Sequence, residues 1–163
     1  MKYYLIGLPG SGKSTIGREL AKNLKLKFID TDRVIEKEYG NISTIFKEHG
    51  ESYFRDIESK VLESLMPLDD VVISCGGGIV ERDINKTYMN GLVVYLDTSL
   101  KEINNRLSND TSRPLMANNS IMDLYKRRHQ KYDEFKTFRI KGLIISKAIN
   151  DIKKETNKRC KKK

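Results

Sequence analysis

Short apolar runs alternate with helical periodicity along the 163 residues of this chain. Buried strands are predicted where the runs are nearly continuous, at residues 3–6, 27–29, 71–75, 92–96 and 143–145. Between the runs, apolar residues recur at the spacing of a helix face, as Ile16, Leu20 and Leu24 do. Because strands and helices alternate, the pattern favours an α/β fold with a central five-stranded parallel sheet and helices on both faces.

Further helices complete the expected pattern. They are predicted at residues 33–40, 42–46, 51–66, 81–89, 100–107, 121–135 and 149–157. Ser43 is the expected N-cap of the short helix, and Pro67 ends the one after it, because proline has no amide hydrogen to donate. Ligands of parallel sheets bind beyond the carboxyl ends of the strands, so the residues that follow each strand are the first candidates for a functional site.

A glycine-rich loop stands directly after the first predicted strand. From Gly7 to Ser14 it reads G-x-x-x-x-G-K-S, the pattern of loops whose backbone N–H groups and following helix N-terminus bind phosphate oxygens. Lys13 would reach the β- and γ-phosphates, and the Ser14 hydroxyl would ligate magnesium. The predicted nucleotide-binding residues here are Gly10, Ser11, Gly12, Lys13, Ser14 and Thr15. The alternative is a glycine-rich turn capped by Ser14.

Two aspartates, Asp30 and Asp32, follow the second predicted strand. Their spacing aims both side chains to one side of the strand end, where they would repel each other unless a cation shares the site. We expect Asp30 to help hold Mg²⁺ through water, and Asp32 to take the proton of an acceptor hydroxyl. The alternative is a cap for the helix that follows, and both interpretations can hold together.

Three glycines, Gly76, Gly77 and Gly78, stand directly after the third predicted strand. A plain turn needs one or two, so three favour a place where a ligand closely approaches the backbone. Arg55 lies on the predicted helix before this strand, near Glu58. Its guanidinium would suit an acceptor carboxylate, although an arginine beside acids on a helix usually forms a surface ion pair.

The polar stretch at residues 108–120 is long for a simple connection, which favours a mobile lid. Arg113 would then close on the phosphates as charge develops during transfer. Arg106, where the lid begins, either contacts the nucleotide or is a solvated helix residue. Arg127 and Arg128 on the next predicted helix either belong to a solvated basic face or hold an anionic acceptor.

Charge and cysteine content narrow the function classes. The net charge is +9, and residues 147–163 carry eight Lys or Arg against two acids. This end has no aromatic residue to stack on bases, so a solvated tail is favoured over nucleic-acid binding. No run of 18 apolar residues predicts a membrane span. With only Cys75 and Cys160, and Met1 leading straight into the first strand, we expect a cytoplasmic protein without a signal peptide.

Taken together, these motifs resemble those of shikimate kinases from residue 1 to about residue 151. The resemblance rests on GLPGSGKST at 7–15, F-x-D-x-D at 28–32, an F-R-x-x-E type element at 54–58, the three glycines, and R-P-L at 113–115. It implies a three-layer P-loop kinase fold, similar to nucleoside monophosphate kinases. It also implies transfer of the γ-phosphoryl group of ATP to the 3-hydroxyl of shikimate, with Mg²⁺, in aromatic amino-acid biosynthesis. By the same resemblance we expect a monomer that binds ATP and shikimate but no nucleic acid or membrane.

The resemblance also implies roles for single residues. It gives Asp32, Arg55, Gly77 and Arg128 as shikimate ligands, with Gly76 and Gly78 beside them. It gives Lys13 and Arg113 as phosphate contacts, Ser14 as the magnesium ligand and Arg106 as an adenine-side residue, so Asp32, Lys13 and Arg113 form the expected catalytic set. Its moving parts are an acceptor-binding segment at about 33–59 and the lid. We expect a single domain over residues 1–163, with a basic tail at about 153–163.

The sequence departs from the family pattern in two places. The family's R-x-P-L-Y element appears here at residues 128–132 without its Pro and Leu. Counting back from Tyr132 selects Arg128 as the acceptor arginine, and Arg127 stays an alternative. Residues 146–149, expected to follow the last strand, lack most of the Thr, Asn and Pro of the family's adenine loop.

Three other functions share part of this pattern. A gluconate kinase would share the phosphate loop, but a neutral polyol acceptor needs no paired arginines such as Arg55 and Arg128. A nucleoside monophosphate kinase would normally have more arginines in its lid than Arg113 alone. A regulatory or nucleic-acid-binding module that uses the basic tail would need the phosphate loop but no acceptor pocket.

Overall fold

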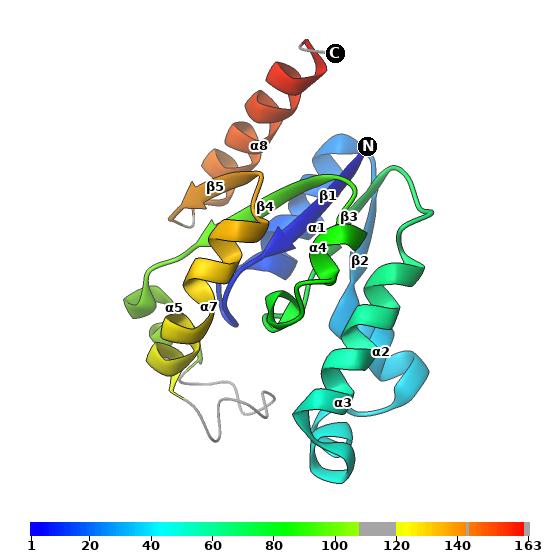
Figure 1. Ribbon diagram of the computed structural model, residues 1–163. Helices are drawn as coiled ribbons and strands as arrows, with labels where there is room; N and C mark the ends of the chain where they lie inside the picture. The colour runs from blue at the N-terminus through cyan, green and yellow to red at the C-terminus, as the bar shows by residue number, and fades with distance from the viewer. Residues whose placement is uncertain (108–119, 143, 162–163) are drawn as a thin grey trace.

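The computed structural model describes residues 1–107, 120–142 and 144–161, and within them one five-stranded sheet organises the chain (Figure 1). The strands are β1 (Lys2–Ile6), β2 (Lys27–Asp30), β3 (Val71–Ser74), β4 (Leu92–Asp97) and β5 (Phe138–Lys141). Their order is β2-β3-β1-β4-β5, and each neighbouring pair is parallel. The carboxyl ends of all five strands therefore lie at one edge of the sheet.

Helices connect the strands and cover both faces of the sheet. They are α1 (Lys13–Leu24), α2 (Thr31–Tyr39), α3 (Ile42–Ser64), α4 (Asn85–Tyr88), α5 (Leu100–Leu107), α7 (Ile121–Phe135) and α8 (Ile145–Cys160), with a 3₁₀ helix, η1 (Ile79–Glu81). Helices α1 and α8 pack on one face, and α2, α3, α5 and α7 pack on the other. None of the helices in the described ranges has the length and apolar character that a membrane crossing requires.

Strand β1 shows how the sequence produces two cores. Tyr3 and Leu5 pack against α1 and α8, whereas Tyr4 and Ile6 pack against the opposite layer. Successive side chains of a strand point to opposite faces, so a strand that is apolar at every position has to be covered on both sides. The predicted sheet and its two helical layers are thus confirmed, and the predicted lid falls outside the described residues except for Ser120.

The last predicted strand was wrong. The structure has β5 at Phe138–Lys141, where Phe138 and Ile140 pack inward, and α8 begins at Ile145. Among the described residues β5 pairs with β4 alone, at the sheet edge. Such a strand alternates apolar and polar residues, so it is harder to predict than the apolar run at 143–145. Ile144 is 68% exposed, and residue 143 lies outside the described ranges. Residues 146–149 belong to α8 and not to a loop.

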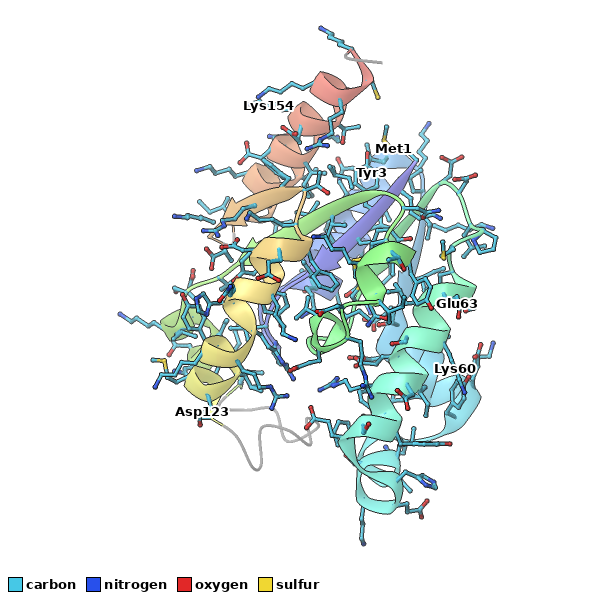
Figure 2. All side chains as sticks on the ribbon, in the orientation of Figure 1. Met1, Tyr3, Lys60, Glu63, Asp123 and Lys154 are labelled. Atoms are coloured by element: carbon cyan, nitrogen blue, oxygen red, sulfur yellow. The ribbon has the colours of Figure 1, made fainter. Side chains whose placement is uncertain are left out.

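Other predicted helix boundaries also differ from those in the structure. The predicted helices at 42–46 and 51–66 form the two parts of α3, which is broken at Gly50 (φ 82°), and the N-cap is Asn41 in place of Ser43. The predicted helix at 81–89 is two short pieces, η1 and α4. The basic tail continues α8 as far as Cys160, and Figure 2 shows Lys154 extending from that helix away from the sheet. Residues 153–160 of the predicted basic tail are therefore part of α8.

Candidate active site

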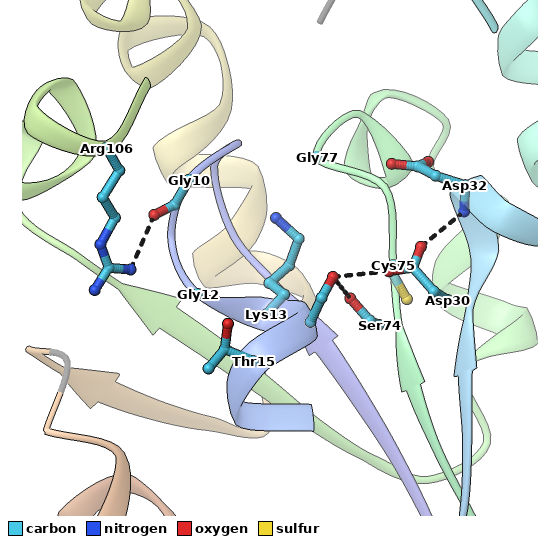
Figure 3. A pocket seen from close by; sticks show the side chains of 11 residues that line it. Gly10, Gly12, Lys13, Thr15, Asp30, Asp32, Ser74, Cys75, Gly77 and Arg106 are labelled. Atoms are coloured by element: carbon cyan, nitrogen blue, oxygen red, sulfur yellow. Dashed lines mark hydrogen bonds between the residues drawn. The ribbon is translucent and has the colours of Figure 1, made fainter. Parts of the chain in front are cut away.

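A cavity of about 210 Å³ opens at the carboxyl edge of the sheet (Figure 3). Segments that follow β1, β2 and β3 meet there, because parallel strands place these ends side by side. The cavity is lined by Gly10, Gly12, Lys13, Ser14, Thr15, Asp30, Asp32, Ser74, Cys75, Gly77 and Arg106. Most of the residues predicted from the phosphate loop and the aspartate pair are therefore brought together.

The phosphate loop is held in shape by its own backbone and its neighbours. Gly10 and Gly12 have φ values of 77° and 90°, a region that residues with a side chain rarely adopt. A Cβ on Gly10 would also lie 3.1 Å from the side chain of Leu107. The Ser11 amide donates to the Leu8 carbonyl at 3.1 Å, and the Thr98 hydroxyl donates to the Ser11 carbonyl at 3.1 Å. These contacts preform the turn that leads into α1.

Lys13 lies inside this turn and is 92% buried, with 8% of its surface exposed. Its amine donates to the carbonyl oxygens of Gly7 at 2.8 Å and Leu8 at 2.9 Å. A buried ammonium group needs such acceptors, because burial removes its water. The amine is thereby kept at the floor of the cavity, within the loop that would surround a phosphate group.

Asp30 joins the phosphate loop to α2. Its Oδ2 accepts a hydrogen bond from the Ser14 hydroxyl at 2.7 Å, while its Oδ1 accepts from the Asp32 amide at 3.1 Å and caps α2. The Ser14 hydroxyl is also 3.3 Å from that of Ser74. Both interpretations of the aspartate pair thus agree with the geometry, since Asp30 is a helix cap whose other oxygen faces the loop.

The oxygen atoms of Ser14 and Asp30 are of the type that Mg²⁺ prefers. No group of three or more His, Cys, Asp or Glu side chains that could hold a metal is found within residues 1–107, 120–142 and 144–161. A magnesium ion that arrives with a nucleotide needs only one or two protein oxygens, because phosphate and water supply the others. The residues present therefore fit a nucleotide-bound magnesium better than a resident metal.

Asp32 lies on the opposite wall of the cavity from the phosphate loop. Figure 3 shows its carboxylate pointing toward the segment that carries Gly77. The neighbouring Thr31 hydroxyl accepts a hydrogen bond from the Gly76 amide at 2.9 Å, which ties the start of α2 to the three glycines. Asp32 is thus placed between the donor loop and the segment beyond β3.

The three glycines are needed because side chains of this chain pack directly on their backbone. A Cβ on Gly78 would lie 1.9 Å from Nη1 of Arg55, and one on Gly76 would lie 2.5 Å from Oε1 of Glu58. Real Cβ atoms do not approach other atoms so closely, and one on Gly77 would meet Pro9 at 3.0 Å. The expected close approach is therefore present, but charged groups of the protein itself make it. Gly77 alone of the three lines the cavity.

Arg55 forms a buried ion pair in place of the surface pair that its sequence context favoured. Its side chain is 5% exposed and that of Glu58 is 2% exposed, with Nη1 2.5 Å from Oε2. Its Nη2 contacts Oε1 of Glu51 at 3.0 Å. Burial raises the pKa of Glu58 to about 7 although Arg55 opposes that shift. Arg55 is held firmly beside Gly78, outside the residues that line the cavity.

Arg127 and Arg128 occupy different environments on α7. The Arg128 side chain is 1% exposed, and its Nε donates to Oε1 of Glu81 at 2.6 Å. The Arg127 side chain is 39% exposed and contacts both Glu81 and Glu51. Burial thus distinguishes the two arginines that the sequence left open. Like Arg55, Arg128 is not among the residues that line the cavity.

Arg106 is exposed at the end of α5, lines the cavity, and its Nη1 is 3.4 Å from the Gly10 carbonyl. Arg113 and the rest of the predicted lid at 108–119 lie outside the described residues. Cys75 is buried, and burial raises the pKa of its thiol, whereas Cys160 is exposed at the end of α8. Neither cysteine shares a disulfide.

Three residues at the site, Tyr132, Glu51 and Glu81, make contacts that were not predicted from the sequence. The Tyr132 hydroxyl donates to the Gly77 carbonyl at 2.5 Å and so ties α7 to the glycines. Glu81 and Glu51 join the arginines of α3 and α7. The i,i+4 spacing of Glu51 and Arg55 is a signal that helical periodicity offers. No local spacing predicts that Glu81 contacts α7, because Glu81 and its partners there are 46 and 47 positions apart.

Comparison with known proteins agrees with this geometry. The family model described as "Shikimate kinase" matches residues 9–157. The chain is 42% identical to a shikimate kinase of Clostridium botulinum over 159 residues, covering 94% of this chain and 95% of that protein. A shikimate kinase of Persephonella marina is 42% identical over 134 residues, covering 79% and 82%.

Solved structures give the same result. The structure of an Acinetobacter baumannii shikimate kinase in complex with shikimate superposes with a TM-score of 0.91 at 32% identity, covering 97% of this chain and 93% of that one. An Aquifex aeolicus shikimate kinase gives 0.84 at 31% identity, with 98% of both chains covered. A match of the family model to most of the chain, supported by relatives above 40% identity, places it clearly: the chain belongs to the shikimate kinase family.

Proposed function

We propose that the chain transfers the γ-phosphoryl group of ATP to the 3-hydroxyl of shikimate, giving shikimate 3-phosphate and ADP in aromatic amino-acid biosynthesis. The observation that carries the proposal is the cavity in which the phosphate loop faces Asp32 and Gly77, with Arg55 buried against Gly78 and Arg128 buried on α7. Membership of the shikimate kinase family supports the same acceptor.

The donor half would bind ATP through the loop at Gly7–Ser14 and Thr15. Its amides and the N-terminus of α1 would receive the phosphates, and the Lys13 amine would exchange the Gly7 and Leu8 carbonyls for phosphate oxygens. Ser14 would hold Mg²⁺ directly and Asp30 would hold it through water. Arg106 would lie on the adenine side, and Arg113 would contact the transferred phosphoryl group. When bound with ATP, Mg²⁺ supplies charge neutralisation at the phosphates.

The acceptor half would hold shikimate by its carboxylate and present its hydroxyl to Asp32. Arg55 and Arg128 are the proposed carboxylate ligands, because a guanidinium binds a carboxylate through two parallel hydrogen bonds. Gly76, Gly77 and Gly78 would let the ring lie against the backbone. In the transfer, Asp32 accepts the hydroxyl proton, the hydroxyl oxygen forms the new P–O bond, and the bond from γ-phosphorus to the bridging oxygen breaks to release ADP.

We further propose that residues 1–163 act as a single domain and as a monomer in the cytoplasm, with no nucleic acid or membrane as partner. The monomer is supported by a donor loop and acceptor arginines that all come from one chain. The basic face of α8 lies on the layer opposite α3 and α7, and so is remote from the acceptor arginines.

A coupled assay of ADP release tests the function directly. Purified protein with Mg-ATP should release ADP when shikimate is added, and EDTA should abolish that release. Gluconate and a nucleoside monophosphate serve as acceptor controls and should give only the background rate. Release that ignores shikimate but follows either control acceptor would reject the proposed substrate.

A further inference from the structure

Glu81 lies at the end of η1, just beyond the three glycines, and accepts from two arginines of α7. Its Oε1 is 2.6 Å from Nε of Arg128 and 2.8 Å from Nε of Arg127, with Nη2 of Arg127 at 2.7 Å. The Glu81 side chain is 15% exposed. Burial raises the pKa of this carboxyl, but hydrogen bonds from Arg128 and Arg127 outweigh burial and lower it. Glu81 is therefore an anion held by two cations.

The same contacts continue from η1 to α3. Nη2 of Arg127 also lies 2.9 Å from Oε1 of Glu51, and that oxygen is 3.0 Å from Nη2 of Arg55. Charges of alternating sign thus run from Arg55 through Glu51, Arg127 and Glu81 to Arg128. The two proposed carboxylate ligands are the ends of this row, and they come from helices that are distant in sequence.

The row leaves one nitrogen of Arg128 for another acceptor. Glu81 occupies its Nε, whereas Nη2 is buried and has no hydrogen-bond partner among the described residues. A buried guanidinium N–H without a partner is costly, and most such groups in proteins are satisfied by a protein atom, water or ligand. Arg128 is also close enough to Glu58 to act on its charge, as Arg55 and Asp32 do. Arg128 therefore lies near Glu58 and Asp32, with one guanidinium nitrogen that has no hydrogen-bond partner among the described residues.

We propose that Glu81 is a positioning residue of the acceptor site, which fixes Arg128 through Nε and leaves Nη2 for the carboxylate of the substrate. This inference rests on the proposed function. Arg127 is then a link whose guanidinium is shared between Glu81 and Glu51, so it does not bind the acceptor. If Glu81 merely neutralised the charge of Arg128, it would weaken binding of the acceptor carboxylate. Removing the charge of Glu81 would then lower the KM for shikimate.

Steady-state kinetics of Glu81→Gln separates these effects, because glutamine keeps the shape of the side chain and removes its charge. The KM for shikimate should rise about tenfold, which corresponds to about 1.4 kcal/mol, while the KM for ATP stays within about twofold. The matched control is Asp56→Asn, which removes the carboxylate of the exposed ion pair between Asp56 and Arg82. The control should leave both KM values unchanged. A shikimate KM that is unchanged or lower in Glu81→Gln overturns the proposal.

A substrate without the carboxylate tests whether Glu81 acts through Arg128. With the primary alcohol analogue of shikimate, wild type and Glu81→Gln should have the same acceptor KM, because no anion remains for Arg128 to hold. A tenfold difference that persists with the alcohol would show a general loss of structure and would overturn the positioning role.

A second variant keeps the test decisive if Glu81→Gln does not fold. Glu81→Asp retains the charge on a shorter side chain, so it should melt near the wild-type temperature and raise the shikimate KM by only about threefold. A shikimate KM equal to that of wild type in Glu81→Asp, together with an unfolded Glu81→Gln, would indicate a purely structural residue and overturn the inference. Wild-type protein that releases no ADP with shikimate would instead overturn the proposed function, and this inference with it.

Discussion

The donor and acceptor halves of the candidate site meet at Gly77 but differ in how they are built. The donor half is one continuous loop whose shape depends on glycine backbone angles and mainly on hydrogen bonds within the loop, with one more from Thr98. The acceptor half is built from charged side chains of α3, η1 and α7 that pair with one another, and Arg55 and Glu58 of α3 pack against the glycines.

This difference has an energetic consequence. Backbone N–H groups carry no net charge, and the buried Lys13 ammonium of the donor half is held by neutral carbonyl oxygens, whereas the buried guanidinium groups of the acceptor half lie beside carboxylates. In the acceptor half, three glutamates, Glu51, Glu58 and Glu81, form ion pairs with its arginines. Removal of one member of such a buried pair strongly destabilises a protein, so this half should be the more sensitive to substitution.

The largest expected effect is on the residue that faces both halves. Asp32→Asn should lower kcat about 100- to 10,000-fold, because the amide cannot accept the hydroxyl proton. The affinity for ATP, measured by calorimetric titration, should stay within about twofold, since Asp32 makes no part of the phosphate loop. Turnover close to that of wild type would remove Asp32 from the mechanism and leave the two halves without a shared residue.

The next effect separates the neighbouring arginines of α7. Arg128→Ala should raise the shikimate KM about a hundredfold, because a buried charge-assisted contact with the substrate is lost. Arg127→Ala removes a 39% exposed side chain and should raise it only about threefold. Measuring both variants in one assay decides the assignment, and the reverse order would move the acceptor contact by one residue.

A smaller effect is expected where the glycines support the arginine of α3. An alanine Cβ at Gly78 would lie 1.9 Å from Nη1 of Arg55, so Gly78→Ala must displace that side chain. We expect the shikimate KM to rise about tenfold and stability to fall by about 1–3 kcal/mol, with the ATP KM as the internal control. Equal losses for ATP and shikimate would mean that the glycines serve both halves.

The smallest effect concerns the pH dependence of stability. Burial raises the pKa of Glu58 from 4.5 to about 7 in the folded protein, against the effect of Arg55. The unfolded chain releases this proton near pH 4.5, so the stability that Glu58 contributes is complete below pH 4.5 and is lost as the pH rises to about 7. Thermal melts should show a shallower slope for Glu58→Gln over this interval, and parallel slopes would argue against a protonated Glu58.

Much of the donor half could be predicted because its signals are local. The spacing of Gly7, Gly12, Lys13 and Ser14 defines the loop, and the apolar runs around it define the strands that present it. A role for the two aspartates after β2 could be predicted for the same reason. The sequence could not show that Asp30 both caps α2 and contacts the phosphate loop.

The acceptor half and the last strand of the sheet could not be predicted as well, because they depend on contacts between residues that are distant in the sequence. The choice between Arg127 and Arg128 follows from which one α7 buries, and periodicity on a basic helix does not reveal that. The misplaced last strand has a related cause, since β5 at the sheet edge lacks the continuous apolar run of a central strand.

By itself, the sequence determined the order of strands and helices, the phosphate loop and the residue types available for the acceptor. Those features depend on backbone angles and on side-chain spacing within a few residues. Tertiary structure alone decided that Glu81 pairs with Arg128, that Arg55 is buried with Glu58, and that Arg55 packs against Gly78. Burial and ion pairing between distant segments arise only when the helices pack on the sheet, and that packing brings the donor and acceptor halves together.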